Sequence, residues 1–315
     1  MRGCVSSSIG GSSDHDVSFD PSCAMSDSLG SPEPWPAPAK LNLCLHIVGR
    51  RADGYHLLQT AMQFITLNDE LRFFRRPPGV IERLGGLADV PAESDLVVRA
   101  ARVLAEQSGA GSGVAIDVTK NIPAQAGLGG GSSDAATVLV ALNRLWNLNL
   151  TPDALVTLGL RLGADVPLFV RGVTAWAEGV GEYLTALDVP EVTYLVIKPQ
   201  AAVSTKEIFQ AAELTRNSPV TTIRDFLAGG GRNDCTSTVR GRYPEIAEAL
   251  DWLEEFGRAQ LTGTGSCVFA AVRDEATART ALRRLPARWS GYVVRGTNRS
   301  PLLERLEEER LRVGR

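Results

Sequence analysis

The sequence has few residues of the kinds that build metal sites and disulfide frameworks. It contains three histidines and five widely spaced cysteines, and no C-x-x-C pair occurs. A zinc site would need ligands from distant segments, and an odd, scattered set of thiols does not form a disulfide scaffold. We therefore expect buried or incidental thiols in a reducing cytoplasm at Cys4, Cys23, Cys44, Cys235 and Cys267.

Long apolar runs and a strong charge of one sign are also missing. No uninterrupted apolar stretch reaches the roughly 18 to 20 residues that cross a bilayer, so we expect no membrane partner. The 33 basic and 36 acidic residues give a net charge of −3. Broad nucleic-acid binding normally requires a basic surface, so this balance argues against a nucleic-acid partner.

The composition is typical of globular proteins, with 44% hydrophobic and 22% charged residues among 315. This length predicts roughly two domains. Residues 1–34 are rich in Ser, Gly, Asp and Pro and lack apolar periodicity, so we expect a flexible tail that is not a secretory signal, with order beginning near Trp35. The charged residues 302–315 predict an exposed helix or frayed end.

Strand-like and helix-like apolar patterns are intermixed along the rest of the chain. The expected strands are 41–48, with one buried face, then 61–74, 114–120, 193–198 and 291–297, and a strand–turn–strand unit at 261–272. One helix is expected to begin at Leu96, after a cap at Ser94 or Asp95. Four further helices are expected at 136–148, 152–162, 244–256 and 275–285. Because strands and helices do not alternate strictly, we predict an α+β protein with mixed or antiparallel sheets.

The most informative segment is NIPAQAGLGGGSSDAATVLVAL, residues 121–142. Its glycines permit positive φ angles and a close approach of backbone to ligand. The expected helix that follows directs unpaired N–H groups and the positive end of its dipole into the glycine-rich turn. This combination predicts an anion site suited to a polyphosphate, to which Ser132 and Ser133 add hydroxyl groups.

Two other phosphate-binding motifs do not match this segment. A Walker A loop requires a lysine after the glycines, and a Rossmann fingerprint requires Gly or Ala where Ser132 stands. A glycine turn that merely lets a helix cap itself with serine remains the competing interpretation.

Several motifs in order resemble those of the GHMP kinases. They are PxxxGLGGGSSDAA in the glycine-rich segment, PAPAKLNLCLHIVGRRADGYHLLQT at 36–60, LRLGADVPLFVRG at 160–172, LTGTGSCVFA at 261–270 and NRSPL at 298–302. The resemblance runs from about Pro36 to Leu302. It implies a two-lobed fold with an N-terminal lobe like ribosomal protein S5 domain 2 (35–190), a ferredoxin-like C-terminal lobe (191–303) and a charged tail (304–315).

The resemblance also implies the chemistry, which is ATP-dependent phosphorylation of a hydroxyl on a small cytidine-containing alcohol. Asp165 matches the catalytic base, and Lys40 matches the lysine beside it. The positions that match substrate-binding residues are Asn42, Tyr55, His56, Thr205 and Phe209. Independently of the family, Asn42 shares a strand face with Lys40, and Thr205 and Phe209 share a helix face. Without the resemblance, the sequence indicates only that Asp165 caps a helix or turns the chain between Gly163 and Pro167.

For ATP, the resemblance implies that Asp95, Leu96 and Lys120 flank the adenosine, although relatives often carry asparagine at the position of Asp95. The expected phosphate loop comprises Pro123, Ala124, Gln125, Ala126, Gly127, Leu128, Gly129, Gly130, Gly131, Ser132 and Ser133. Gly263, Thr264 and Gly265 are expected to form the opposite wall. Mg²⁺ is expected to arrive with ATP, held by phosphates and water, so no protein metal ligand is predicted. We expect a cytoplasmic monomer or weak homodimer.

Two alternative functions remain open at this point. One is another GHMP kinase activity, on homoserine or a mevalonate derivative, against which the DGYH segment argues. The other is a nucleotide-binding sensor that kept the fold and lost the chemistry, against which Lys40 and Asp165 argue.

Overall fold

A computed structural model describes residues 28–85, 91, 93–109 and 112–313. Its sheet is organised around one long strand, β3 (His56–Arg76). This strand pairs with five others, namely β1 (Trp35–Asn42), β2 (His46–Arg50), β5 (Gly113–Thr119), β6 (Ala175–Gly179) and β11 (Ser290–Thr297). The strand predicted at 61–74 is thus confirmed and extends further in both directions.

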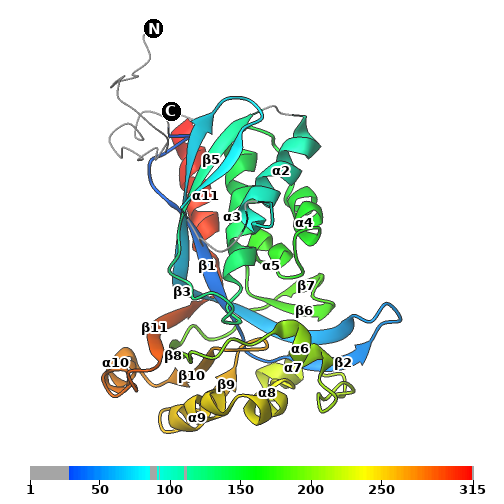
Figure 1. Ribbon diagram of the computed structural model, residues 1–315, viewed down its shortest axis with the longest axis vertical. Helices are drawn as coiled ribbons and strands as arrows, with labels where there is room; N and C mark the ends of the chain where they lie inside the picture. The colour runs from blue at the N-terminus through cyan, green and yellow to red at the C-terminus, as the bar shows by residue number, and fades with distance from the viewer. Residues whose placement is uncertain (1–27, 86–90, 92, 110–111, 314–315) are drawn as a thin grey trace, which may run out of the picture.

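The sheet continues through β11 into the C-terminal half of the chain (Figure 1). The strand order there is β11, β8 (Thr193–Lys198), β10 (Val268–Val272) and β9 (Ala259–Leu261). At its other end, β4 (Ile81–Gly85) runs parallel to β5, whereas the other pairs of named strands are antiparallel; β7 (Tyr183–Ala186) pairs with β6. The prediction of an α+β fold with mixed and antiparallel pairing is confirmed.

Two groups of helices cover this sheet (Figure 1). The first comprises α2 (Leu96–Ser108), α3 (Gly130–Leu145), α4 (Pro152–Leu160), α5 (Val166–Arg171) and α11 (Pro301–Val313). The second comprises α6 (Thr205–Gln210), α7 (Ile223–Leu227), α8 (Thr236–Arg242), α9 (Pro244–Leu253) and α10 (Glu275–Arg283). The buried apolar side chains form two large clusters, one mainly from residues 29–177 and one mainly from residues 195–289.

The single strand predicted at 41–48 is wrong in two respects. The predicted strand is interrupted between Asn42, where β1 ends, and His46, where β2 begins. Its side chains are buried on both faces rather than one. The reason is that β1 lies between two packed layers. On one side α3 and α11 contact it, and on the other Leu41 belongs to a cluster with Tyr194 and Phe269 of the C-terminal half.

Three further expectations need correction. Order begins before Trp35, because Leu29 is buried and its N–H donates to the Phe73 carbonyl oxygen (2.8 Å); residues 1–27 of the expected tail lie outside the described residues. The helix predicted from 136 begins earlier, at Gly130. The C-terminal helix is confirmed but is not simply exposed, since Arg305 is buried and its guanidinium lies 4.7 Å from the centre of the Trp35 ring.

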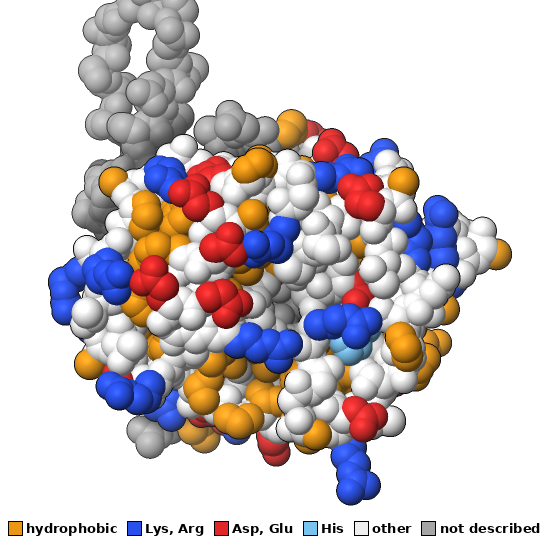
Figure 2. Space-filling model, turned by 90° about the horizontal axis from the view of Figure 1, so that it is seen from below, with side chains coloured by type: hydrophobic (Ala, Val, Ile, Leu, Met, Phe, Trp, Pro, Cys, Tyr) orange, Lys and Arg blue, Asp and Glu red, His pale blue; other side chains and the backbone are white. Residues whose placement is uncertain are grey.

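The surface beneath the C-terminal half carries interspersed acidic and basic side chains (Figure 2). Some of these form ion pairs between neighbouring elements, including Arg284 with Glu255 (3.0 Å) and Arg240 with Asp251 (2.7 Å). Such mixing gives this face no extended basic region for a nucleic-acid backbone. Among the described residues, no helix is long and apolar enough to span a bilayer.

Candidate active site

The glycine-rich loop connects β5 to α3 and has the backbone geometry that its sequence predicts. Gly127 and Gly129 have φ angles of 74° and 76°, in the left-handed region that favours glycine. A Cβ atom at Gly127 would lie 2.3 Å from the Thr262 carbonyl oxygen, and one at Gly129 would lie 2.7 Å from Cζ of Phe169. The loop is therefore packed against both halves of the chain and accepts no side chain at these two positions.

The start of α3 leaves backbone donors available at this loop. Gly129 is the N-cap residue, and the N–H of Ser133 donates to its carbonyl oxygen (2.9 Å). The N–H groups of Gly130, Gly131 and Ser132 precede this bond and belong to the first turn, which lacks intrahelical acceptors. They carry the partial positive charge of the helix N-terminus, so the loop can bind an anion.

A cavity of about 640 Å³ lies against this loop. Its walls include every residue predicted for ATP except Ser133, namely Asp95, Leu96, Lys120, Pro123, Ala124, Gln125, Ala126, Gly127, Leu128, Gly129, Gly130, Gly131 and Ser132. The Ser133 side chain is fully buried, and its hydroxyl has no hydrogen-bond partner among the described residues. In this conformation the Ser133 side chain does not line the cavity.

A second cavity, of about 830 Å³, adjoins the first. Its walls include all residues predicted for catalysis and for the acceptor substrate, namely Lys40, Asn42, Tyr55, His56, Asp165, Thr205 and Phe209. Of the predicted opposite wall, Gly263 and Thr264 line it. The two cavities share Gly127, Gly129, Ser132 and Thr205. The glycine-rich loop thus forms the boundary at which a ligand in one cavity meets a ligand in the other.

Lys40 and Asp165 lie together at this boundary. Lys40 Nζ is 3.6 Å from Asp165 Oδ2, donates to the Gly127 carbonyl oxygen (3.1 Å) and donates to Asn42 Oδ1. The Lys40 side chain is 5% exposed and that of Asp165 is 38% exposed. A carboxylate that is open to the cavity and close to a buried cation is suited to accept a proton from a bound hydroxyl group.

Asn42 belongs to a hydrogen-bond network that the sequence analysis did not identify. Its Nδ2 donates to Thr60 Oγ1 (2.9 Å), and Thr60 Oγ1 donates to the Cys44 carbonyl oxygen (2.6 Å). Thr262 Oγ1 accepts the backbone N–H of Asn42 (3.0 Å) and donates to the Gly127 carbonyl oxygen (3.1 Å). Both threonines lie inside the quoted motifs, but a hydroxyl in a motif does not reveal its partner.

The far end of the second cavity carries aromatic rings. His56 and Phe209 stack, with ring centroids 5.0 Å apart and an interplanar angle of 30°. Tyr55 is 66% exposed, which is unusual for a large aromatic side chain and leaves its face open. Arg216, which was not predicted, donates through Nε to His56 Nε2 (3.3 Å). Burial and the neighbouring Arg216 charge lower the pKa of His56, so the ring is neutral and its Nε2 accepts.

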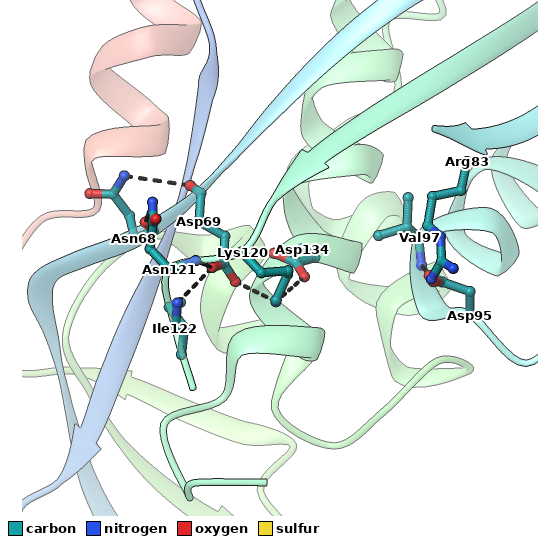
Figure 3. Close-up of polar contacts among 9 residues, drawn as sticks. All are labelled: Asn68, Asp69, Arg83, Asp95, Val97, Lys120, Asn121, Ile122 and Asp134. Atoms are coloured by element: carbon teal, nitrogen blue, oxygen red, sulfur yellow. Dashed lines mark hydrogen bonds and ion pairs between the residues drawn. The ribbon is translucent and has the colours of Figure 1, made fainter. Parts of the chain in front are cut away.

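Two groups of charged residues lie in and behind the wall of the first cavity (Figure 3). Asp95 caps α2 by accepting the Val97 N–H (2.8 Å), as predicted, and forms an ion pair with Arg83. Lys120 forms ion pairs with Asp69 and with Asp134, the latter at 2.7 Å. Neither of these two acids was identified from the sequence. Burial, opposed by Lys120 and reinforced by Asp69, raises the pKa of Asp134 to about 7.

Within the described part of the chain, no group of three or more His, Cys, Asp or Glu side chains is placed to hold a metal ion. The three cysteines in that part, Cys44, Cys235 and Cys267, are unpaired and buried, as predicted. Burial raises the pKa of Cys235 and of Cys267 to about 12, so neither is a reactive thiolate at neutral pH.

The chain is similar to known proteins in sequence and in fold. Residues 95–173 match the GHMP kinases N terminal domain, and residues 210–291 match the GHMP kinases C terminal domain. The chain is 56% identical to a 4-diphosphocytidyl-2-C-methyl-D-erythritol kinase of Alkalilimnicola ehrlichii, covering 87% of this chain and 94% of that protein. It is 54% identical to the protein of the same description from Nitrosococcus oceani, covering 87% and 98%.

Solved structures of similar fold include a 4-(cytidine 5'-diphospho)-2C-methyl-D-erythritol kinase, with a TM-score of 0.73 and 33% identity over 84% of this chain and 99% of that one. The Methanococcus jannaschii mevalonate kinase aligns with a TM-score of 0.65 at 16% identity, over 85% of this chain and 99% of that one. The similarity to the mevalonate kinase concerns the fold alone.

Proposed function

The chain belongs to the GHMP kinase family, and on this premise we propose how its two adjoining cavities work together. The protein is an ATP-dependent kinase that phosphorylates the 2-hydroxyl of 4-diphosphocytidyl-2-C-methyl-D-erythritol, giving the 2-phosphate and ADP, in non-mevalonate isoprenoid precursor biosynthesis. The observation that carries the site assignment is the shared boundary of the cavities, where the glycine-rich loop, Lys40 and Asp165 meet.

In this proposal ATP occupies the cavity of about 640 Å³ with its phosphates against the loop. The N–H groups of Gly130, Gly131 and Ser132 bind phosphate oxygens at the helix N-terminus. Mg²⁺ would be carried by the phosphates and water, since the loop offers backbone donors and the Ser132 hydroxyl rather than a set of carboxylates. It would supply neutralisation of phosphate charge. The terminal phosphoryl group then points across the boundary into the second cavity.

Phosphoryl transfer depends mainly on position and charge, and the residues at the boundary supply both. Asp165 accepts the proton of the acceptor hydroxyl as that oxygen attacks the terminal phosphorus. Lys40 pairs with Asp165 and stabilises the charge that develops on the transferred group. Asn42 holds Lys40 Nζ in place through its Oδ1.

We assign the acceptor's cytidine to the aromatic end of the second cavity. Tyr55 offers an open ring face, and the stacked His56 and Phe209 form an adjacent platform. Aromatic faces bind any base, whereas polar groups at the edge select one. The Thr205 hydroxyl, 2.9 Å from that of Thr264, lies on the wall shared with the nucleotide cavity and is placed to contact the acceptor between its base and its reacting hydroxyl.

The test is to offer purified protein the cytidine-containing alcohol, mevalonate and homoserine separately and to measure ADP release. We expect turnover with the first alone. Turnover confined to mevalonate or homoserine would overturn the acceptor assignment, and ATP binding without turnover on any of the three would indicate a sensor.

We also propose that the enzyme acts in the cytoplasm, where reduced thiols such as the buried Cys44 persist. We propose a monomer or weak homodimer. Light scattering on the eluting peak of a sizing column tests this; a stable higher oligomer would contradict it.

A further inference from the structure

Asp69 occupies an unusual position for an ionisable side chain. It lies in the middle of β3, its side chain is 0% exposed, and it is neither in the glycine-rich loop nor in a cavity wall. Its Oδ1 accepts the backbone N–H groups of both Asn121 (2.6 Å) and Ile122 (2.7 Å), and its Oδ2 accepts from Lys120 Nζ (Figure 3). One buried carboxylate thus binds three consecutive residues.

These three residues lead directly into the nucleotide loop. Lys120 and Ile122 line the nucleotide cavity, and Ile122 also packs beneath the start of α3. A Cβ placed on Gly130 would lie 3.1 Å from Ile122 Cγ2, so the position of Ile122 fixes how closely the first turn of α3 can approach. By binding the N–H of Ile122, Asp69 determines where this turn begins.

Lys120 has a donor left for a ligand. An ammonium group has three N–H donors, and within the described residues two of them are directed to Asp69 and Asp134. The Lys120 side chain is 19% exposed and lines the nucleotide cavity. The two carboxylates hold the ammonium at the cavity wall, which leaves the remaining N–H donor available to an anion in the cavity.

We propose that Asp69 is a positioning residue for nucleotide binding, acting through Lys120 and through the backbone of residues 121–122. The proposal rests on the proposed function of this cavity as the ATP site. Asp69 itself touches no ligand. Asp134 differs from it, because its Oδ2 binds Lys120, while its Oδ1 is buried with no partner among the described residues. Asp134 therefore holds the cation alone, whereas Asp69 holds both the cation and the loop.

The main test is the variant Asp69→Asn, which keeps an oxygen for the two backbone N–H groups and removes the charge that binds Lys120. We expect the KM for ATP to rise about tenfold or more, as for the loss of a charged hydrogen bond. The KM for the acceptor and kcat at saturating ATP should stay within about threefold. This split separates a positioning role from a general loss of structure, which would change all three constants.

The matched control is Glu70→Gln, the same chemical change at the next residue of β3. Neighbouring strand residues face opposite sides, and Glu70 contacts Arg72 (3.5 Å) away from the loop. Its KM for ATP should equal that of the unmodified protein. An unchanged KM for ATP in Asp69→Asn, or an equal rise in Glu70→Gln, would overturn the proposal.

A second variant keeps the test decisive if Asp69→Asn does not fold. The double change Lys120→Met with Asp134→Asn removes one positive and one negative charge and leaves Asp69 bound to the backbone. The KM for ATP should again rise about tenfold if the held cation contributes as proposed; no rise would overturn it. If the unmodified protein itself bound no ATP, the proposed function would fail instead, so the two failures are distinguishable.

Discussion

The carboxylate of Asp165 faces Lys40 Nζ at 3.6 Å although Asp165 stands at the N-cap of α5, where aspartate ordinarily binds a backbone N–H. Its side chain makes no cap hydrogen bond. The interpretation of Asp165 as a simple capping residue is therefore not supported. The short helix instead presents a carboxylate, unpaired with its own backbone, to the cavity where the acceptor is proposed to bind.

Replacing Asp165 by Asn should separate binding from chemistry. The amide cannot accept the hydroxyl proton, so we expect kcat to fall by about 10²- to 10⁴-fold, the range for loss of a general base. ATP affinity should change little, because Asp165 lines the acceptor cavity and not the nucleotide cavity. Titration with ATP and steady-state kinetics measure the two quantities. Activity equal to that of the unmodified enzyme would remove Asp165 from this role.

Replacing Thr60 by Val should reduce catalysis through the loss of its hydrogen bond to Asn42. Valine keeps the shape but removes the acceptor for Asn42 Nδ2, and an unsatisfied buried polar group costs about 1–3 kcal/mol. We expect kcat to fall about tenfold, since about 1.4 kcal/mol corresponds to that factor, while the KM for ATP is kept. Thr60→Ser retains the hydroxyl and should restore kcat; equal kcat in the valine and serine variants would contradict the network.

The variant Gly127→Ala should destabilise the loop. The residue has φ of 74°, and its Cβ would lie 2.3 Å from the Thr262 carbonyl oxygen, which cannot move aside as a flexible side chain does. We expect the free energy of unfolding to fall by about 2–4 kcal/mol, measured in urea, with weaker ATP binding. Gly241→Ala is the control, because a Cβ there meets nothing within 4 Å and the residue is helical. It should be neutral or stabilising by up to about 1 kcal/mol.

The raised pKa of Asp134, about 7 against an ordinary 3.8, predicts a specific pH dependence of stability. Between these values the folded protein binds more protons at this site than the unfolded chain, so this group's contribution to the free energy of unfolding falls as pH rises through the window. Asp134→Asn removes that contribution. Relative to the unmodified protein, the variant should therefore gain stability progressively as the pH rises from about 4 to about 7, as followed by Tm. A constant difference in Tm would refute it.

Local features of the site could be predicted from the sequence. The glycines before α3 predict an anion-binding turn, because the turn and the N-terminus of the helix are both determined by residues that are adjacent in the sequence. Asp95 as a helix cap follows from the same short-range logic. The approach of Lys40 to Asp165, by contrast, came from the resemblance to a family, since no spacing rule brings β1 and α5 together.

The roles of Asp69, Asp134 and Arg216 could not be predicted. Asp69 lies within the strand predicted at 61–74, and nothing in the segment LNDEL distinguishes it from its polar neighbours. Only the pairing of β3 with β5, which places Glu70 opposite Thr119, brings Asp69 beside Lys120. The burial of β1 on both faces has a similar origin, because it depends on the C-terminal half packing against a strand whose alternation suggests one buried face. Tertiary contacts of this kind leave no local pattern.

The length of β3 has a consequence for how the acceptor preference of such an enzyme can change. This strand carries Thr60 beside the acceptor cavity and Asp69 beneath the nucleotide loop, and it is paired along both edges. Its regular rise sets the spacing between the parts that serve donor and acceptor, independently of the loops. Exchanging the hairpin formed by β2 and the start of β3 would alter which alcohol is bound while triphosphate binding is retained. Selectivity for donor and for acceptor can therefore evolve separately although both sites are built on the same strand.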